Sequence, residues 1–143
     1  MVIRALIVDD SALIRKVLSD ILNQDPKIAV IGTAINGEDG LEKVRKLKPD
    51  VVLLDNIMPV LDGLKTLSHI MEEFPTPVVI VSALGGEKAE EITLTALEYG
   101  AVDVIEKLRV FSVKVCTRWQ KKFVQKSEQL QKPILITLGA SGI

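Results

Sequence analysis

The chain has 143 residues, 48% hydrophobic and 26% charged, which fits one globular domain and excludes a disordered segment. Its formal net charge is -1, so the composition gives no sign of a nucleic-acid-binding surface. No uncharged apolar run approaches the roughly 18 residues that a transmembrane helix needs. Arg4, Asp9 and Asp10 interrupt the N-terminal stretch, which therefore does not resemble a signal peptide. The single cysteine, Cys116, excludes an internal disulfide, so we expect a cytoplasmic protein without membrane contact.

Five short apolar runs, typical of strands, alternate with four helical patterns up to residue 105. Asn36 and Gly37 are predicted to form a turn, and Gly63 is predicted to be a turn residue after the third strand. Gly100 is predicted to follow the end of the last helix as its C′ residue. The predicted strands are 5–8, 28–34, 51–54, 78–81 and 102–105, and the predicted helices are 13–22, 41–47, 64–74 and 87–99.

Polar side chains follow four of these strands at the point where each strand ends. Each connection between strands is long enough for a right-handed crossover, so the pattern predicts a doubly wound parallel α/β sheet. In such sheets, ligands bind at the carboxyl ends of the strands, where the strand order reverses. The residues expected at that edge are Asp9 and Asp10 after the first strand, Asp55 after the third, Ser82 after the fourth and Lys107 after the fifth.

The chemistry of this set favours phosphoryl transfer to a carboxylate. Three crowded carboxylates repel one another, and a divalent cation relieves that repulsion. Carboxylate, carbonyl and water oxygens suit Mg2+, which keeps several waters and needs few protein ligands. Lys107 would add a cation and Ser82 a hydroxyl donor. Asp55 is the best candidate nucleophile, because its strand is an apolar run that reads as central to the sheet.

The same residues resemble the signature of response regulator receiver domains over residues 1–109. The resemblance implies a flavodoxin-like, five-stranded sheet with strand order 2-1-3-4-5. It also implies that Asp55 accepts a phosphoryl group from a histidine kinase, in a two-component system, and that phosphorylation switches partner binding. The matching motifs are Asp9-Asp10-Ser11, Asp55 with Met58-Pro59, Asp62-Gly63, Ser82-Ala83, and Gly100-Ala101 to Lys107.

The resemblance assigns a role to each site residue. Asp10, Asp55 and the backbone carbonyl of Ile57 would bind Mg2+, with Asp9 acting through a water molecule. Ser82 and Lys107 would contact the phosphoryl group. The only histidine, His69, has no role in this scheme and is expected at the surface of the third helix.

Four further stretches match one branch of the family more closely, namely residues 11–22, Gly32-Thr33-Ala34, residues 59–67 and Thr76-Pro77-Val78. They resemble the regulatory domain of the chemotaxis protein-glutamate methylesterase. In that branch a linker leads to a catalytic domain that opens with a strand and Gly-Ala-Ser, and residues 133–141 resemble this opening. The branch's later catalytic His and Asp are absent, so no enzyme activity is expected on this chain beyond self-phosphorylation and dephosphorylation. The alternative function is therefore the regulatory part of a methylesterase and glutamine deamidase, with a chemotaxis receptor or an effector domain as partner. The fragment assigned to the linker is 110–132, with a helix predicted at 111–131.

Three departures from the family pattern concern switching rather than acceptor chemistry. Leu108 stands where receivers have proline, Val104 where many have an aromatic residue, and Ile57 where this branch has an acid. We therefore expect a trans peptide bond before Leu108, since a cis bond without proline costs about 2.5–4 kcal/mol. Because Val104 is not aromatic, we expect the effect of phosphorylation to be transmitted without an aromatic rotamer change on the fifth strand. Movement of Ser82 and of residues 83–86 would transmit it to the helix predicted at 87–99.

The apolar stretch 133–143 should be covered, either by the receiver's own surface or by the same segment in a homodimer.

A competing function for the same fold is flavin binding. A flavin-binding protein of the flavodoxin type would need a Ser/Thr/Gly-rich phosphate loop after the first strand. Asp9 and Asp10 stand there instead and would repel the flavin phosphate.

Overall fold

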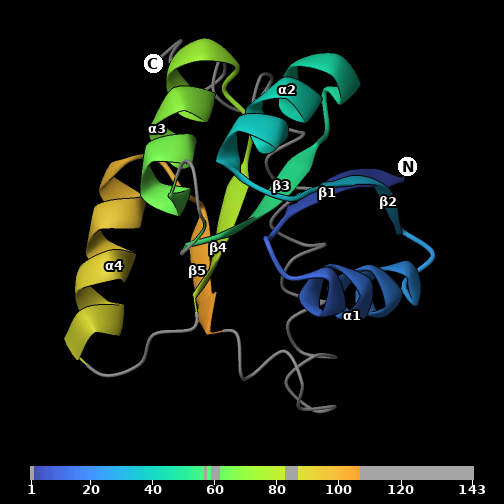
Figure 1. The fold of residues 1–143 in the computed structure, drawn as a ribbon, viewed down its shortest axis with the longest axis horizontal. Coiled ribbons are helices and arrows are strands. Elements are labelled where there is room, and N and C mark those ends of the chain that lie inside the picture. The colour runs from blue at the N-terminus through green and yellow to red at the C-terminus, as the bar shows by residue number, and fades with distance from the viewer. Residues whose placement is uncertain (1, 57, 59–61, 83–86, 107–143) are drawn as a thin grey trace, which may run out of the picture.

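A computed structural model of the chain describes residues 2–56, 58, 62–82 and 87–106. Five parallel strands form one sheet of order β2-β1-β3-β4-β5 (Figure 1), which confirms the predicted doubly wound α/β fold and its strand order. The elements are β1 (Ile3–Val8), α1 (Ala12–Asn23), β2 (Ile28–Ala34), α2 (Gly37–Leu47), β3 (Val51–Asp55), α3 (Gly63–Glu73), β4 (Val78–Ser82), α4 (Glu87–Glu98) and β5 (Asp103–Glu106).

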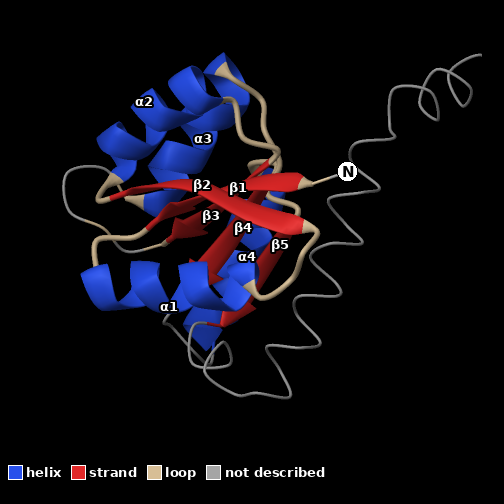
Figure 2. Ribbon diagram, turned by 90° about the vertical axis from the view of Figure 1, so that its right-hand side faces the viewer, coloured by secondary structure: helices blue, strands red, loops and turns tan. Residues whose placement is uncertain are grey.

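Helices cover both faces of the sheet, as Figure 2 shows with α1 below it and α2 and α3 above it. Alternation along β1 produces this arrangement, because successive side chains of a strand point to opposite faces. Ile7 packs in a buried cluster with Leu18 of α1, whereas Leu6 packs in a second cluster with Val44 of α2 and Leu67 of α3. The central strand β3 is buried along its whole length, as its continuous apolar run predicts.

The order of the strands reverses between β1 and β3. From β1 the chain crosses to β2 on one side and then returns to β3 on the other, so β1 pairs with both. Val8 lies opposite Leu54, and the residues that follow these two therefore leave the sheet side by side. This is the switch point at which open α/β sheets bind their ligands.

Two predicted turns are in fact helix starts. Asn36 is the N-cap of α2, with its side chain accepting a hydrogen bond from the Asp39 amide at 2.8 Å, and Gly37 is the first helical residue. Gly63 is likewise the first residue of α3, after the N-cap Asp62. The prediction was wrong at both places because Asn, Asp and Gly serve turns and N-caps equally well. Gly100 has a φ of 104°, which confirms its predicted role after α4.

Several predictions fall outside the described residues. They concern the peptide bond between residues 107 and 108, the helix at 111–131 and the tail at 133–143. His69 is exposed on α3, as predicted. Among the described residues, no helix is both long enough and apolar enough to cross a membrane.

Candidate functional site

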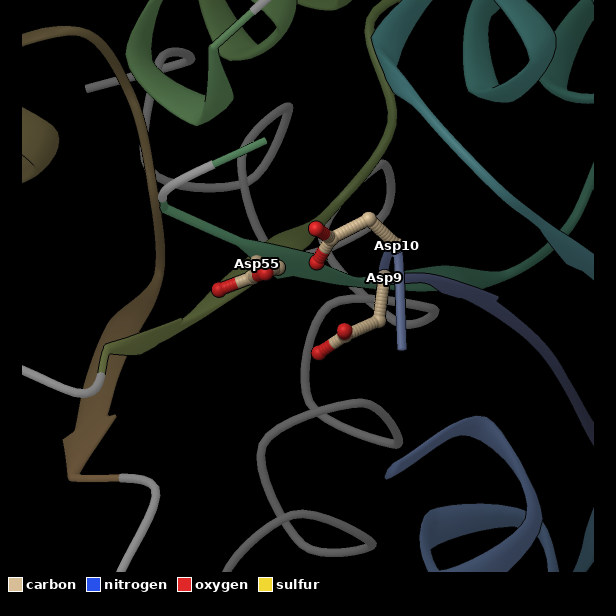
Figure 3. Close-up of side chains that lie close together, drawn as sticks. All are labelled: Asp9, Asp10 and Asp55. Carbon is tan, nitrogen blue, oxygen red and sulfur yellow. The ribbon is translucent and has the colours of Figure 1, made fainter. Parts of the chain in front are cut away.

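Three carboxylates gather at the switch point, as the sequence predicts. Asp9 and Asp10 follow the end of β1 and Asp55 ends β3 (Figure 3), and each offers an oxygen within 4.8 Å of the others. Asp9 and Asp55 are only 1% and 3% exposed, whereas Asp10 is exposed. The site therefore combines two buried acids with one that is accessible to solvent.

Asp9 is held through its backbone and its side chain. Its amide donates to the carbonyl of Ala34 at 3.0 Å, which continues the β1–β2 ladder past the end of β1. Its Oδ1 accepts from the amide of Ser11 at 2.9 Å, and its carbonyl accepts from the guanidinium of Arg15 at 2.7 Å. Ser11 in turn is the N-cap of α1, with Oγ accepting from the Ile14 amide at 3.3 Å. The start of α1 thus fixes the geometry of the first acid.

Asp55 is fixed by the approach of α3 to the end of β3. The amide of Gly63 donates to the carbonyl of Asn56 at 2.8 Å, and the Asn56 amide donates to the carbonyl of Val81 at 3.3 Å. A Cβ on Gly63 would lie 2.3 Å from the Asp55 carbonyl oxygen and 2.6 Å from the Asn56 Cα. Only glycine allows this contact, so the close packing of α3 against the backbone of Asp55 and Asn56 depends on Gly63.

Ser82 reaches the same edge of the sheet from β4. Asp55 lies opposite Val81 in the register of β3 and β4, which places Ser82 one residue beyond the acid. It is 2% exposed. The structure thus brings three of the predicted residues together and places Ser82 at their edge, while Ile57 and Lys107 lie outside the described residues.

The donor set fits a hard divalent cation. All three side chains are carboxylates, and two of them are buried, where a concentration of negative charge is costly without a counter-charge. Oxygen-only coordination by few protein groups suits Mg2+, which retains water and accepts substrate oxygens in the rest of its shell. A buried acid at the end of a strand with a metal beside it is a suitable acceptor for a transferred phosphoryl group.

Two residues that contribute to this geometry were missed in the sequence. Arg15 falls within the predicted helix 13–22, and long helical side chains point back toward the N-terminus, so this side chain can reach the preceding loop. The sequence predicts Gly63 only as a turn residue, and nothing local in it reveals the contact of Gly63 with Asp55.

Comparisons with known proteins assign most of the chain to one family. The model of the response regulator receiver domain matches residues 5–110. The chain is 99% identical over 107 residues to a protein-glutamate methylesterase/protein-glutamine glutaminase of Methanosarcina mazei, which covers 75% of this chain and 29% of that protein. A corresponding protein of Methanosarcina acetivorans is 84% identical over 107 residues, or 75% of this chain and 30% of that protein. The chain thus spans less than a third of the length of these relatives.

Solved structures give the same assignment. The response regulator domain of Thermotoga maritima CheB superposes with a TM-score of 0.77 at 42% identity, over 90% of this chain and 96% of that one. A chain of the CheX–CheY–BeF3–Mg complex from Borrelia burgdorferi superposes with a TM-score of 0.67 at 36% identity, over 73% of this chain and 78% of that one. The chain therefore belongs to the response regulator receiver domains, the phosphoacceptor domains of two-component signalling, and is similar to those of protein-glutamate methylesterases.

Proposed function

We propose that Asp55 is the phosphoacceptor of this receiver and that a histidine kinase is its donor. The observation that carries the proposal is the gathering of Asp9, Asp10 and Asp55 within 4.8 Å at the switch point of the sheet. Asp55 is the member that ends the central strand β3, and its backbone is paired in the sheet opposite Val81 of β4. Such fixation favours in-line attack, because the nucleophile is already oriented.

The proposed reaction is a transfer between two groups. One Asp55 carboxylate oxygen forms a bond to phosphorus, while the bond between phosphorus and the donor's imidazole nitrogen breaks and the donor retains that electron pair. With a small acyl phosphate as donor, the phosphorus–oxygen bond breaks instead and acetate leaves. The product is an acyl phosphate on Asp55, whose hydrolysis returns the free carboxylate.

Mg2+ is the metal that fits the donor set, and Asp10, Asp55 and the Ile57 carbonyl are the proposed direct ligands, with Asp9 acting through water. When bound, the ion neutralises negative charge on the phosphoryl oxygens. Ser82 is proposed to donate its hydroxyl, and Lys107 its ammonium, to that group. Support for Ser82 is its place at the same sheet edge, one residue past the partner of Asp55. The Borrelia complex, one chain of which has a similar fold, is a complex with Mg and BeF3.

For the whole chain we propose the regulatory role of a methylesterase and glutaminase. The support is the identity of 99% over 107 residues with the relative from Methanosarcina mazei. The proposed organisation is a receiver at 1–109, a helix or linker at 110–132 and a tail at 133–143 that resembles the start of the catalytic domain. A chemotaxis receptor or that effector domain is the proposed partner. A homodimer through the C-terminal segment and a location in the cytoplasm complete the proposal.

We expect the full chain to gain one phosphoryl group from acetyl phosphate in the presence of Mg2+ and none in excess EDTA. The reason is that three clustered carboxylates repel an incoming phosphate unless a cation offsets their charge. Intact-mass spectrometry after short incubations measures the gain. Equal labelling with and without EDTA would show that the acidic cluster is not the metal site, and no labelling in either condition would contradict the phosphoacceptor role.

A further inference from the structure

Arg15 connects α1 to the peptide that joins the two acids after β1. Its guanidinium donates to the carbonyl of Asp9 at 2.7 Å, and this bond is partly buried. That carbonyl belongs to the peptide unit between Asp9 and Asp10. Because a peptide unit is planar, holding its carbonyl also restrains the amide and the Cα of Asp10.

The two acids depend on this bond to different degrees. The Asp9 carboxylate is buried, and its Oδ1 accepts from the Ser11 amide at 2.9 Å. The Asp10 side chain is exposed, so packing in the core does not place it. Its position follows from the backbone that precedes it, and Arg15 holds that backbone from one side while Ala34 accepts the Asp9 amide on the other.

From this geometry, we infer that Arg15 is a positioning residue for the metal site, holding the Asp9–Asp10 peptide so that both carboxylates face Asp55. The inference rests on the proposed Mg2+ site. Hydrogen-bond partners behind metal ligands commonly set affinity by orienting those ligands, and their loss costs roughly 10–100-fold in metal binding. Arg15 would act in this way through a main-chain carbonyl rather than through a ligand side chain.

The sign of the effect separates positioning from simple electrostatics. A cation beside three carboxylates opposes the binding of a second cation, so removing its charge alone should tighten Mg2+ binding. Removing a positioning bond should weaken it. An Arg15 that only satisfies the Asp9 carbonyl would change the stability of the fold but not the affinity for the metal.

The test is calorimetric titration of the unphosphorylated full chain with Mg2+. We expect Arg15→Met to raise the Mg2+ dissociation constant about tenfold, and Arg15→Lys, which retains charge and one donor group, to lie between it and the wild type. Lys16→Met is the matched control. It removes the same charge from the next residue of α1. The Lys16 side chain is 76% exposed, and its Nζ lies 3.6 Å from Oδ2 of Asp20, whose side chain is 65% exposed.

The outcomes distinguish the inference from the proposed function. If Lys16→Met binds like the wild type and Arg15→Met binds as tightly or more tightly, the positioning role is wrong although the metal site stands. If Arg15→Met and Lys16→Met weaken Mg2+ binding equally, the positioning role is also wrong, because the effect then follows from the loss of a positive charge anywhere on α1. If the wild type itself does not bind Mg2+, the proposed metal site fails first. Should Arg15→Met not fold, Arg15→Gln is titrated under the same criteria.

Discussion

Asp55→Asn is expected to abolish uptake of a phosphoryl group from acetyl phosphate. The amide oxygen that replaces the carboxylate is a poor nucleophile, and the neighbouring acids, Asp9 and Asp10, follow β1 rather than ending β3 as Asp55 does. The substitution conserves volume in a side chain that is 3% exposed, so the fold should persist. Intact-mass spectrometry measures the labelling, and circular dichroism checks the fold.

Asp20→Asn provides the matched control for this loss. Asp20 lies on α1 with its side chain 65% exposed, in an ion pair with Lys16. The change removes one carboxylate from the chain without touching the acidic cluster, so labelling should equal that of the wild type. Undiminished labelling of Asp55→Asn would mean that another residue accepts the phosphoryl group.

Gly63→Ala is expected to have the second largest effect, on stability and on phosphorylation together. The new Cβ would lie 2.3 Å from the Asp55 carbonyl oxygen, and the atoms that it meets are backbone, which yields only by moving α3 or the end of β3. Overpacking of this kind costs about 3 kcal/mol in the free energy of unfolding. A displacement of Asp55 by about 1 Å would slow labelling roughly 100-fold.

Gly32→Ala is the control for this substitution. It makes the same chemical change in β2, where the new Cβ would meet the end of the Leu47 side chain at 3.0 Å. A side-chain end can move aside, so we expect a small loss of stability and an unchanged labelling rate. Chemical denaturation and the labelling rate at saturating Mg2+ give the two readouts. If Gly63→Ala lowered stability but labelled at the wild-type rate, the contact would not position Asp55.

The order of elements could be predicted because local signals were consistent. The run 51–54 is continuously apolar, as a strand buried on both faces requires, and β3 is indeed buried throughout. The acids after β1 and β3 could be placed together because a parallel sheet brings the carboxyl ends of its strands to one edge. These two arguments use only chain order and the period of the hydrophobic pattern.

What could not be predicted depends on contacts between distant parts of the chain. The contact of Gly63 with Asp55 is set by the docking of α3, and no pattern around residue 63 shows it. Lys48 ends α2 in the left-handed conformation at φ 49°, where glycine is usual. Arg4 on β1 donates to the carbonyls of Leu47 and Lys48 at 2.7 and 2.8 Å, which stabilises that helix end from 43 residues away.

The measurement that tests the central claim most directly is the location of the transferred phosphoryl group. Borohydride reduces an aspartyl phosphate to homoserine, which marks the acceptor permanently for peptide mapping. After treatment with acetyl phosphate and Mg2+, we predict homoserine at position 55 and unmodified aspartate at positions 9 and 10, although all three carboxylates lie within 4.8 Å. Homoserine at position 9 or 10, with aspartate retained at 55, would contradict the assignment.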